Sequence, residues 1–357
     1  MSKFFGCRQR LEKRGEYMSS TVQTVRGPVE AQAIGAALMH EHLLCDVTPP
    51  GKFAPGEPDE PITLENVWEI RYHWCESPGN TRLEDENIIV QELRELADVG
   101  MDTVVELTSE GMKRDPEGLL RVSQAADLHI VMGCGYYIEP FLGTSVHEAR
   151  TDVIAAKLIE EIRHGVGTTG VRPGIIGEIG CSGDWTPLER AIMHAAVVAQ
   201  QETGLCINVH PHRSSRAPYE IVSYIRECGG TPERTIISHI DRTIFDLPTL
   251  YELADTGCII EYDFFGIESS HYPFQALDLP NDGMRLKAVR DLCDRGHLAQ
   301  VVISQDICTK TRLRRFGGHG YTHIAKNVIP MMRSGRFSED EITTIIRDTP
   351  RRLLSAV

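Results

Sequence analysis

The sequence predicts a (β/α)8 barrel, an α/β fold of eight parallel strands joined by helices. Three observations lead to this fold class. Short apolar segments alternate with longer amphipathic ones along most of the chain, as strands alternate with helices in a parallel sheet. There are eight such apolar segments, the number that closes a barrel. No G-x-G-x-x-G turn follows the first of them, which disfavours the alternative, an open doubly wound sheet.

The predicted strands are short and rich in apolar residues. They cover 36–42, 103–108, 129–134, 174–179, 205–210, 234–239, 257–262 and 300–305. Helices are predicted between most of them, because apolar residues recur three and four positions apart, as Ile192, Ala195 and Ala199 do. These helices cover 83–99, 116–126, 151–164, 187–203, 216–228, 247–255 and 281–296. Two more, over 321–333 and 338–346, are predicted to close the barrel after the eighth strand.

The chain of 357 residues is long enough for one large barrel, and we expect a single domain over residues 21–357. Residues 1–20 are predicted to be a disordered tail. They hold the only basic run, but no apolar stretch follows it, so it is not a secretory signal. A transit peptide stays open as an alternative. Residues 47–64 are rich in Pro and Gly and predict a long loop.

The composition excludes several classes of protein. Hydrophobic residues make up 41% and charged residues 25%, the balance of a soluble globular protein. The net charge of −14 argues against nucleic acid as the main partner. No apolar run of about 18 residues exists, so no membrane span is expected. The ten cysteines are scattered and form no C-x-x-C pair, which favours a reduced, cytoplasmic protein.

The first chemical signal is the pair His40 and His42, expected near the end of the first strand. Residues two apart in a strand point to the same face, so both imidazoles can reach one metal ion from inside the barrel. An H-x-H pair alone is weak evidence, because histidine is also common on surfaces and at hydrogen-bonded core positions.

Further ligand types are predicted at the carboxyl ends of other strands. Glu178 ends the fourth strand, His210 the fifth and His239 the sixth, and Asp306 follows the eighth. In a barrel these ends converge on one mouth, where the active sites of this fold lie. With the H-x-H pair they give four imidazoles and two carboxylates, enough for two metal ions with open coordination positions.

Longer stretches around these residues resemble the phosphotriesterase-related branch of the amidohydrolase superfamily. The similarity covers nearly everything from Thr21 to the C-terminus. It rests on 24–28 (TVRGP), 38–43 (LMHEHL), 177–182 (GEIGCS), 210–218 (HPHRSSRAP), 238–243 (SHIDRT), 261–266 (EYDFFG), 306–312 (DICTKTR) and 317–321 (GGHGY).

The resemblance implies a binuclear metal centre in which one glutamate bridges the two ions, where phosphotriesterases themselves carry a carboxylated lysine. The implied ligands are His40, His42 and Asp306 for the more buried metal, His210 and His239 for the more exposed metal, and Glu178 for the bridge. Such ligands accept Zn, Mn, Co or Fe, and we expect two zinc ions per chain.

The resemblance also implies a mechanism. Two cations lower the pKa of a shared water, and the resulting hydroxide attacks the substrate. Asp306 would be the catalytic residue that takes the proton and passes it to the leaving group. Gln305 departs from the pattern, because relatives often carry His directly before the metal-binding Asp. This change puts in doubt the fine tuning of the metal site, and not the binding of metal itself.

The loops after the fifth and eighth strands are basic, which is unusual in so acidic a chain. We hypothesise that they bind an anionic group of the substrate, a carboxylate or a sulfonate. The alternative is that their cations form structural ion pairs with carboxylates such as Asp241 and Asp263. Aromatic residues could also line the pocket: Tyr136 and Tyr137 after the third strand, and Tyr262, Phe264 and Phe265 after the seventh. The candidate substrate-binding residues are Arg213, Arg216, Lys310 and Tyr136.

The leading functional interpretation is a hydrolase for an amide or ester of a small acid, of the N-acyl amino acid or N-acyltaurine amidohydrolase type. One alternative is a lactonase or phosphotriesterase, although a neutral triester would make no use of the basic loops. A third interpretation is a non-catalytic protein that binds a small molecule. It is disfavoured because a protein that had lost turnover should also lose metal ligands, and all six are present. The expected partner is a small-molecule substrate. A homodimer is the common default, but no residue argues for it directly.

Overall fold

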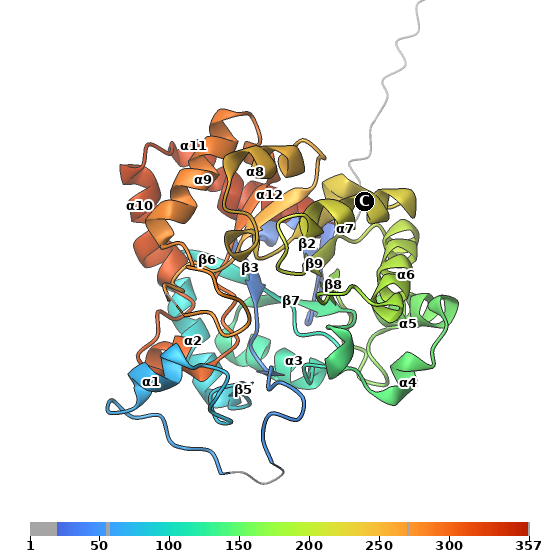
Figure 1. Cartoon of the computed structure of the whole chain (residues 1–357), viewed down its shortest axis with the longest axis horizontal. Coiled ribbons are helices and arrows are strands. Elements are labelled where there is room, and N and C mark those ends of the chain that lie inside the picture. Colours follow the sequence, from blue (N-terminus) through green and yellow to red (C-terminus); the bar gives the residue numbers. More distant parts are fainter. Residues whose placement is uncertain (1–19, 55–57, 270, 356–357) are drawn as a thin grey trace, which may run out of the picture.

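The computed structural model describes residues 20–54, 58–269 and 271–355. In these ranges eight parallel strands lie side by side in the order β3, β6, β7, β8, β9, β10, β11, β12. Figure 1 shows helices around the strands, with α5 beside α6 on the right and the C-terminal helices beside α9 at the upper left. The predicted barrel is therefore confirmed. The tail predicted over 1–20 lies, except for Ser20, outside the described residues.

The observed elements follow the predicted ones closely. The barrel strands are β3 (Ala36–Glu41), β6 (Met101–Glu106), β7 (His129–Cys134), β8 (Ile175–Gly180), β9 (Ile207–His210), β10 (Thr235–Ile237), β11 (Ile259–Tyr262) and β12 (Val301–Ile303). The α-helices are α1 (Val67–Tyr72), α2 (Glu86–Ala97), α3 (Pro116–Ala126), α4 (Thr144–His147), α5 (Thr151–His164), α6 (Pro187–Thr203), α7 (Ala217–Glu227), α8 (Leu247–Ala254), α9 (Asp282–Asp294), α10 (Ile329–Ser334), α11 (Glu339–Thr343) and α12 (Thr349–Leu354).

The helix between the fourth and fifth barrel strands shows why the boundaries could be predicted. Helix α6 begins with a capping box, in which the Thr186 side chain accepts from the Glu189 backbone and the Glu189 side chain accepts from the Thr186 backbone. Pro187 fills the first turn, where its missing N–H costs nothing. Gly204, with φ +71°, ends the helix in the left-handed conformation that glycine tolerates best.

The first and last strands meet without a regular ladder between them. Two backbone hydrogen bonds join them instead, from the Asp306 N–H to the His40 carbonyl (3.0 Å) and from the His42 N–H to the Ile307 carbonyl (3.2 Å). The buried Glu41 carboxylate also accepts from the Ser304 hydroxyl across this seam. The seam therefore includes the backbone of three candidate ligands, His40, His42 and Asp306, and it lies next to their side chains.

The barrel is closed at the amino ends of its strands. The hairpin of β1 (Thr21–Thr24) and β2 (Gly27–Glu30) brings Val22 into one buried cluster with Leu353 and Leu354 of α12. Residues from seven barrel strands, Val131 and Ile259 among them, belong to the same cluster. The short antiparallel pair β4 (Cys45–Asp46) and β5 (Arg82–Leu83) lies outside the barrel sheet. Access to the barrel interior is thus left to the carboxyl ends, as in other barrels of this kind.

Two features of the C-terminal segment differ from the predictions. The predicted closing helices are broken by π-helical turns over Ile324–Val328 and Thr344–Asp348, and α12 follows as an extra helix. Each π-helical turn covers only five residues, which is too short for the apolar pattern of the sequence to reveal the change in hydrogen-bond spacing. Where the structure describes the predicted loop of 47–64, it contains no helix or strand.

No helix in the described ranges is both long enough and apolar enough to cross a membrane.

Candidate metal centre

All six nominated ligands lie at the carboxyl ends of barrel strands. Two come from β3 and its end, one from β8, one from the end of β9, and two from the residues just after β10 and β12. Their exposed fractions range from 0% to 8%, so every side chain is buried. They are His40, His42, Glu178, His210, His239 and Asp306.

One group of donor atoms surrounds the H-x-H pair. The Nε2 atoms of His40 and His42 each lie 3.7 Å from an oxygen of the Glu178 carboxylate. Asp306 Oδ1 lies 3.2 Å from His42 Nε2 and 3.9 Å from His40 Nε2. Two imidazoles and two carboxylates thus face one point, a set of donors suited to a divalent cation.

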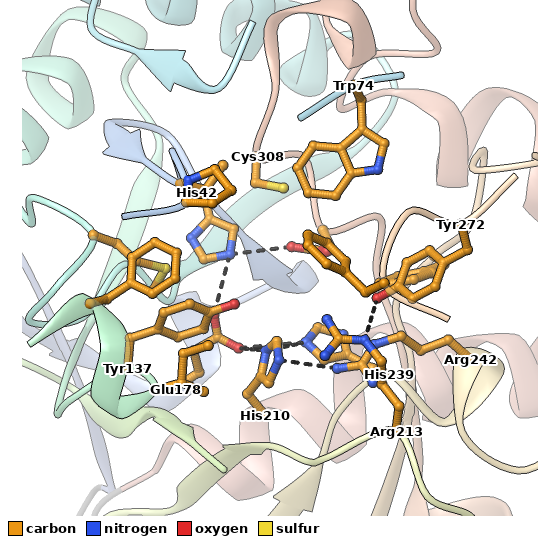
Figure 2. Close-up of a pocket in the computed structure, with 18 of the residues that line it drawn as sticks. His42, Trp74, Tyr137, Glu178, His210, Arg213, His239, Arg242, Tyr272 and Cys308 are labelled. Carbon is orange, nitrogen blue, oxygen red and sulfur yellow. Dashed lines mark hydrogen bonds and ion pairs between the residues drawn. The ribbon is translucent and has the colours of Figure 1, made fainter. Parts of the chain in front are cut away.

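A second group shares the same glutamate. Glu178 Oε2 lies 3.1 Å from His210 Nδ1 and 3.5 Å from His239 Nε2, and these two nitrogens are 3.0 Å apart. Figure 2 shows Glu178 with His42 on one side and His210 and His239 on the other. One carboxylate therefore faces two pairs of imidazoles, which is the arrangement that a bridging ligand requires.

The rings are oriented by partners on their other nitrogens. His40 Nδ1 faces Glu261 (3.1 Å), and His239 Nδ1 faces Asp263 (2.9 Å). Such contacts fix which nitrogen is left for a metal. The remaining nitrogen of His40, Nε2, is buried and has no hydrogen-bond partner within the described residues. Because a buried polar atom without a partner is costly, this vacant lone pair fits a metal ligand.

The carboxylates of the centre are held in their charged form. Burial would raise the pKa of Glu178, but the surrounding imidazoles, His210 foremost, hold that pKa well below its ordinary value. Burial would likewise raise the pKa of Asp306, and the hydrogen bond with His42 lowers it. The pKa of Asp263 is lowered in the same way by the imidazoles beside it. A buried cluster with this much negative charge is suited to cations.

Two of the six residues have an unusual backbone. His239 (φ 57°) and Asp306 (φ 48°) lie in the left-handed region, which non-glycine residues seldom adopt. Both conformations are held by hydrogen bonds: the His239 N–H donates to Asp263 Oδ2 (3.0 Å), and the Asp306 N–H donates to the His40 carbonyl. Strain that the surrounding structure supports in this way is typical of functional sites.

The centre opens into a pocket of about 150 Å³. Its walls combine aromatic rings with cationic side chains, and its floor is formed by the metal-binding residues. The aromatic residues are Trp74, Tyr137, Phe141, Phe264, Tyr272 and Phe274, and the arginines are Arg213, Arg242 and Arg312. The pocket can therefore hold a small organic molecule that carries negative charge, with one end at the metal-binding residues.

The four candidate substrate residues have different positions. Arg213 lines the pocket. Arg216 is exposed and pairs with Glu252 at 3.3 Å, so it points away from the pocket. Lys310 and Tyr136 are also absent from the lining, although Tyr137, the next residue, is part of it.

Gln305, the position that departs from the family pattern, contributes to the barrel seam. Its amide nitrogen lies 3.1 Å from Glu41 Oε1 and donates to the Tyr321 carbonyl (3.3 Å). The residue therefore holds the backbone next to Asp306 and makes no contact with the metal-binding nitrogens.

Sequence reasoning missed several residues of the site. Asp263 and Glu261 support the imidazoles, whereas the sequence suggested only Asp263, and only as a partner in structural ion pairs. Their signal was visible, since two acids flank Tyr262 in an otherwise apolar strand. Arg242 was not considered as a substrate contact. It lies in the stretch 238–243, three residues after His239.

A family model described as the Phosphotriesterase family matches residues 20–354. An N-acetyltaurine hydrolase of Homo sapiens is 37% identical, and the match covers 95% of this chain and 99% of that protein. An N-acetyltaurine hydrolase of Dictyostelium discoideum is 36% identical over 94% of this chain and 98% of that protein.

Solved structures similar to this chain are consistent with membership of this family. A resiniferatoxin-binding protein from Rhodobacter sphaeroides superposes with a TM-score of 0.88 at 30% identity, covering 94% of each chain. The phosphotriesterase homology protein from Escherichia coli, solved with phosphate in its active site, has a TM-score of 0.74 at 27% identity, covering 90% of this chain and 98% of that one. The chain therefore belongs to the phosphotriesterase family, as the resemblance implied, and it is a metal-dependent hydrolase.

Proposed function

We propose that this enzyme hydrolyses the amide bond of a small N-acylated acid, an N-acyl amino acid or an N-acyltaurine, at a centre for two divalent cations. The observation that carries the proposal is the position of Glu178, whose carboxylate faces two separate pairs of imidazoles. His40, His42 and Asp306 would hold one cation and His210 and His239 the other. We expect zinc in both positions.

When bound, the cations would lower the pKa of a shared water and polarise the scissile carbonyl. The protein's own residues supply the remaining steps. The Asp306 carboxylate, charged and at the metal-binding end of the pocket, accepts the proton of the attacking water and returns it to the leaving amine. The aromatic walls hold the substrate and limit the access of water.

The acidic part of the substrate follows from the arginines in the pocket. Arg213, Arg242 and Arg312 all line it, in a chain whose net charge is −14. Cations concentrated in a pocket that reaches the candidate metal ligands favour an anionic substrate. Two relatives described as N-acetyltaurine hydrolases support this choice, because their substrate is an amide of a small sulfonic acid.

Several finer expectations remain proposals. A single domain over 21–357 is supported by the family match over 20–354. A cytoplasmic location is supported by the nine cysteines of the described part, all of which are free thiols. A homodimer stays a prediction. Substrate contacts by Arg216, Lys310 and Tyr136 also stay predictions, and their positions outside the pocket lining do not support them.

Metal analysis combined with a substrate panel tests the function. The panel contains N-acetyltaurine, N-acetyl amino acids, a lactone and an aryl phosphotriester. We expect about two metal ions per chain and turnover of the anionic amides, both lost in Glu178→Ala. Glu160→Ala, which removes an exposed carboxylate, serves as the matched control. Turnover of the lactone or triester alone would contradict the amide proposal, and absence of bound metal after loading would contradict the metal centre.

A further inference from the structure

Arg242 is the feature of the pocket that the hydrolytic centre leaves unexplained. Its side chain is 1% exposed, yet it lines the pocket. Nη2 donates to the Pro211 carbonyl (3.2 Å) and lies 3.1 Å from His210 Nε2. Nη1 is buried and has no hydrogen-bond partner in the part of the chain that the structure describes. A guanidinium with an unused buried donor beside a substrate pocket needs an acceptor that the protein does not supply.

The charge of Arg242 is also unpaired. Other buried arginines of this protein have carboxylate partners: Arg285 contacts Asp241 at 3.0 Å and Arg114 contacts Glu161 at 2.8 Å. Among the described residues, no carboxylate forms an ion pair with Arg242. Because a buried charge without a counter-ion is strongly unfavourable, the position favours an anion that arrives with the ligand.

Arg213 presents a second cation to the same pocket. Its Nε donates to the Tyr272 hydroxyl (3.0 Å), and its guanidinium lies 4.8 Å from the centre of the Phe274 ring. These contacts fix the plane of the group and use neither Nη atom. Arg213 has no ion pair with any described carboxylate either. Figure 2 shows Arg213 and Arg242 on the His210 side of the pocket, with Trp74 on the opposite side.

We propose that Arg242 and Arg213 together bind the acid group of the substrate and select anionic amides over neutral ones. This inference rests on the proposed function for its substrate class. His210 lies between the two ends of the substrate, since its Nδ1 faces Glu178 and its Nε2 faces Arg242. The acid group therefore binds at a distance of about the width of one imidazole ring from the scissile carbonyl. In an N-acyl amino acid or N-acyltaurine only one or two carbon atoms separate the amide nitrogen from the acid, which suits that short span.

A matched pair of substrates tests the selection. N-acetyltaurine and N-acetylethanolamine share the same amide, but one ends in a sulfonate and the other in a hydroxyl. We expect Arg242→Gln to lower kcat/KM for N-acetyltaurine by about 10- to 100-fold, mainly through KM, while the neutral amide changes by less than about threefold. Arg242→Lys should recover only part of the loss, because it keeps the charge but loses the planar fork. Arg150→Gln removes an exposed arginine outside the pocket, one that pairs with Asp152, and should change the turnover of neither substrate.

Two further measurements separate this proposal from other causes. Metal content is determined for every variant, because Arg242 contacts the ligand His210. If the Arg242 variants lose metal or fail to fold, Arg213→Gln decides with the same two substrates, since Arg213 contacts Tyr272 and Phe274, which are not candidate metal ligands. Equal losses for both amides at full metal content would overturn the proposal.

Calorimetric titration of the metal-loaded enzyme with ethanesulfonate measures the acid site without any reaction. We expect binding in the wild type and in Arg150→Gln, and a loss of affinity of at least about tenfold in Arg242→Gln. If the enzyme hydrolyses no amide but this pattern holds, the proposed function fails and the anion site stands. If ethanesulfonate binds equally to all variants, the anion site fails whatever the enzyme hydrolyses.

Discussion

Asp263 accepts two hydrogen bonds from His239, one from its ring Nδ1 (2.9 Å) and one from its backbone N–H (3.0 Å). The second oxygen of the same carboxylate also lies 3.3 Å from the Nδ1 of His40. His40 and His239 belong to different halves of the metal centre, so one buried carboxylate at the end of β11 orients an imidazole for each half. Glu178 contacts both halves at the ring nitrogens that face the proposed cations. Asp263 contacts both halves on the opposite side, at the Nδ1 atoms of His40 and His239.

The first prediction concerns this link. Asp263→Asn keeps the size of the side chain but offers one acceptor where the carboxylate offers two. We expect metal affinity to fall by about 10- to 100-fold at both positions together, because the amide leaves one imidazole without its acceptor and removes the negative charge beside both. Metal content after dialysis against graded chelator measures the effect. Asp127→Asn, at a 91% exposed carboxylate, is the control. Loss from one position alone would show that Asp263 does not couple the two halves.

The second prediction concerns Asp306. Its carboxylate lies at the metal-binding end of the pocket and is held charged, so it is placed to move a proton. Asp306→Asn should lower kcat by about 10²- to 10⁴-fold at saturating metal, with a smaller change in KM. Steady-state kinetics with metal analysis of the same sample measures this effect. Asp348→Asn, at an exposed carboxylate in the C-terminal helices, is the control. An unchanged kcat at full metal occupancy would exclude Asp306 as the proton carrier.

The sequence predicted the fold and the group of ligands because both depend on repeating patterns. Strand ends of a parallel barrel meet at one mouth, so ligand types at those ends could be brought together without coordinates. The sharp helix boundaries, such as Pro187–Thr203, come from local signals in the capping residues.

The residues that line the substrate pocket could not be predicted as completely as the candidate metal ligands, because their positions depend on the path of the backbone after each strand ends. Gly135, at φ +150°, directly follows β7, and of the two tyrosines predicted after this strand, Tyr136 and Tyr137, only Tyr137 lines the pocket. The left-handed conformation of His239 similarly precedes the turn that brings Arg242 into the pocket. Single residues in irregular turns follow no period, so their direction is not encoded in a pattern that can be read from the sequence.

The third prediction concerns stability. Arg285 is fully buried and contacts two carboxylates, Asp241 (3.0 Å) and Asp282 (2.8 Å). Arg285→Met leaves the buried Asp241 without its cation and leaves Asp282 with His323 alone, and we expect the free energy of unfolding to fall by about 3–5 kcal/mol. Chemical denaturation measures the change. Arg347→Met removes an exposed arginine that pairs with its neighbour, and it should alter stability by less than about 1 kcal/mol. A small effect of Arg285→Met would mean that the acids find other partners.

The fourth prediction concerns pH. Arg290 and the Ser338 N–H lower the pKa of Glu341 to about 2, from an ordinary value of about 4.3. Because the folded state lowers this pKa, the pair stabilises the protein above about pH 4.3, and the contribution is lost as the pH falls towards 2. Glu341→Gln should therefore reduce stability by about 0.2–1 kcal/mol at pH 7. Denaturation curves from pH 7 to 3 should show this difference shrinking below pH 4.3; a difference that grows on acidification would contradict the pairing.

The last prediction concerns removal of the metals. Without cations, His40 Nε2 is a buried nitrogen with no partner in the described structure, and the charged Glu178 carboxylate faces imidazoles while Asp306 has Arg312 as its cationic partner at 3.6 Å. Metal binding should therefore stabilise the fold, by about 4 kcal/mol when free metal is a thousandfold above Kd. Thermal unfolding of chelated and zinc-reloaded protein measures this gain. Glu178→Ala should lose most of the zinc-dependent shift in Tm, because each cation site loses a ligand, whereas Glu160→Ala should keep it. A zinc-dependent shift of the same size in Glu178→Ala would place the metal elsewhere in the protein.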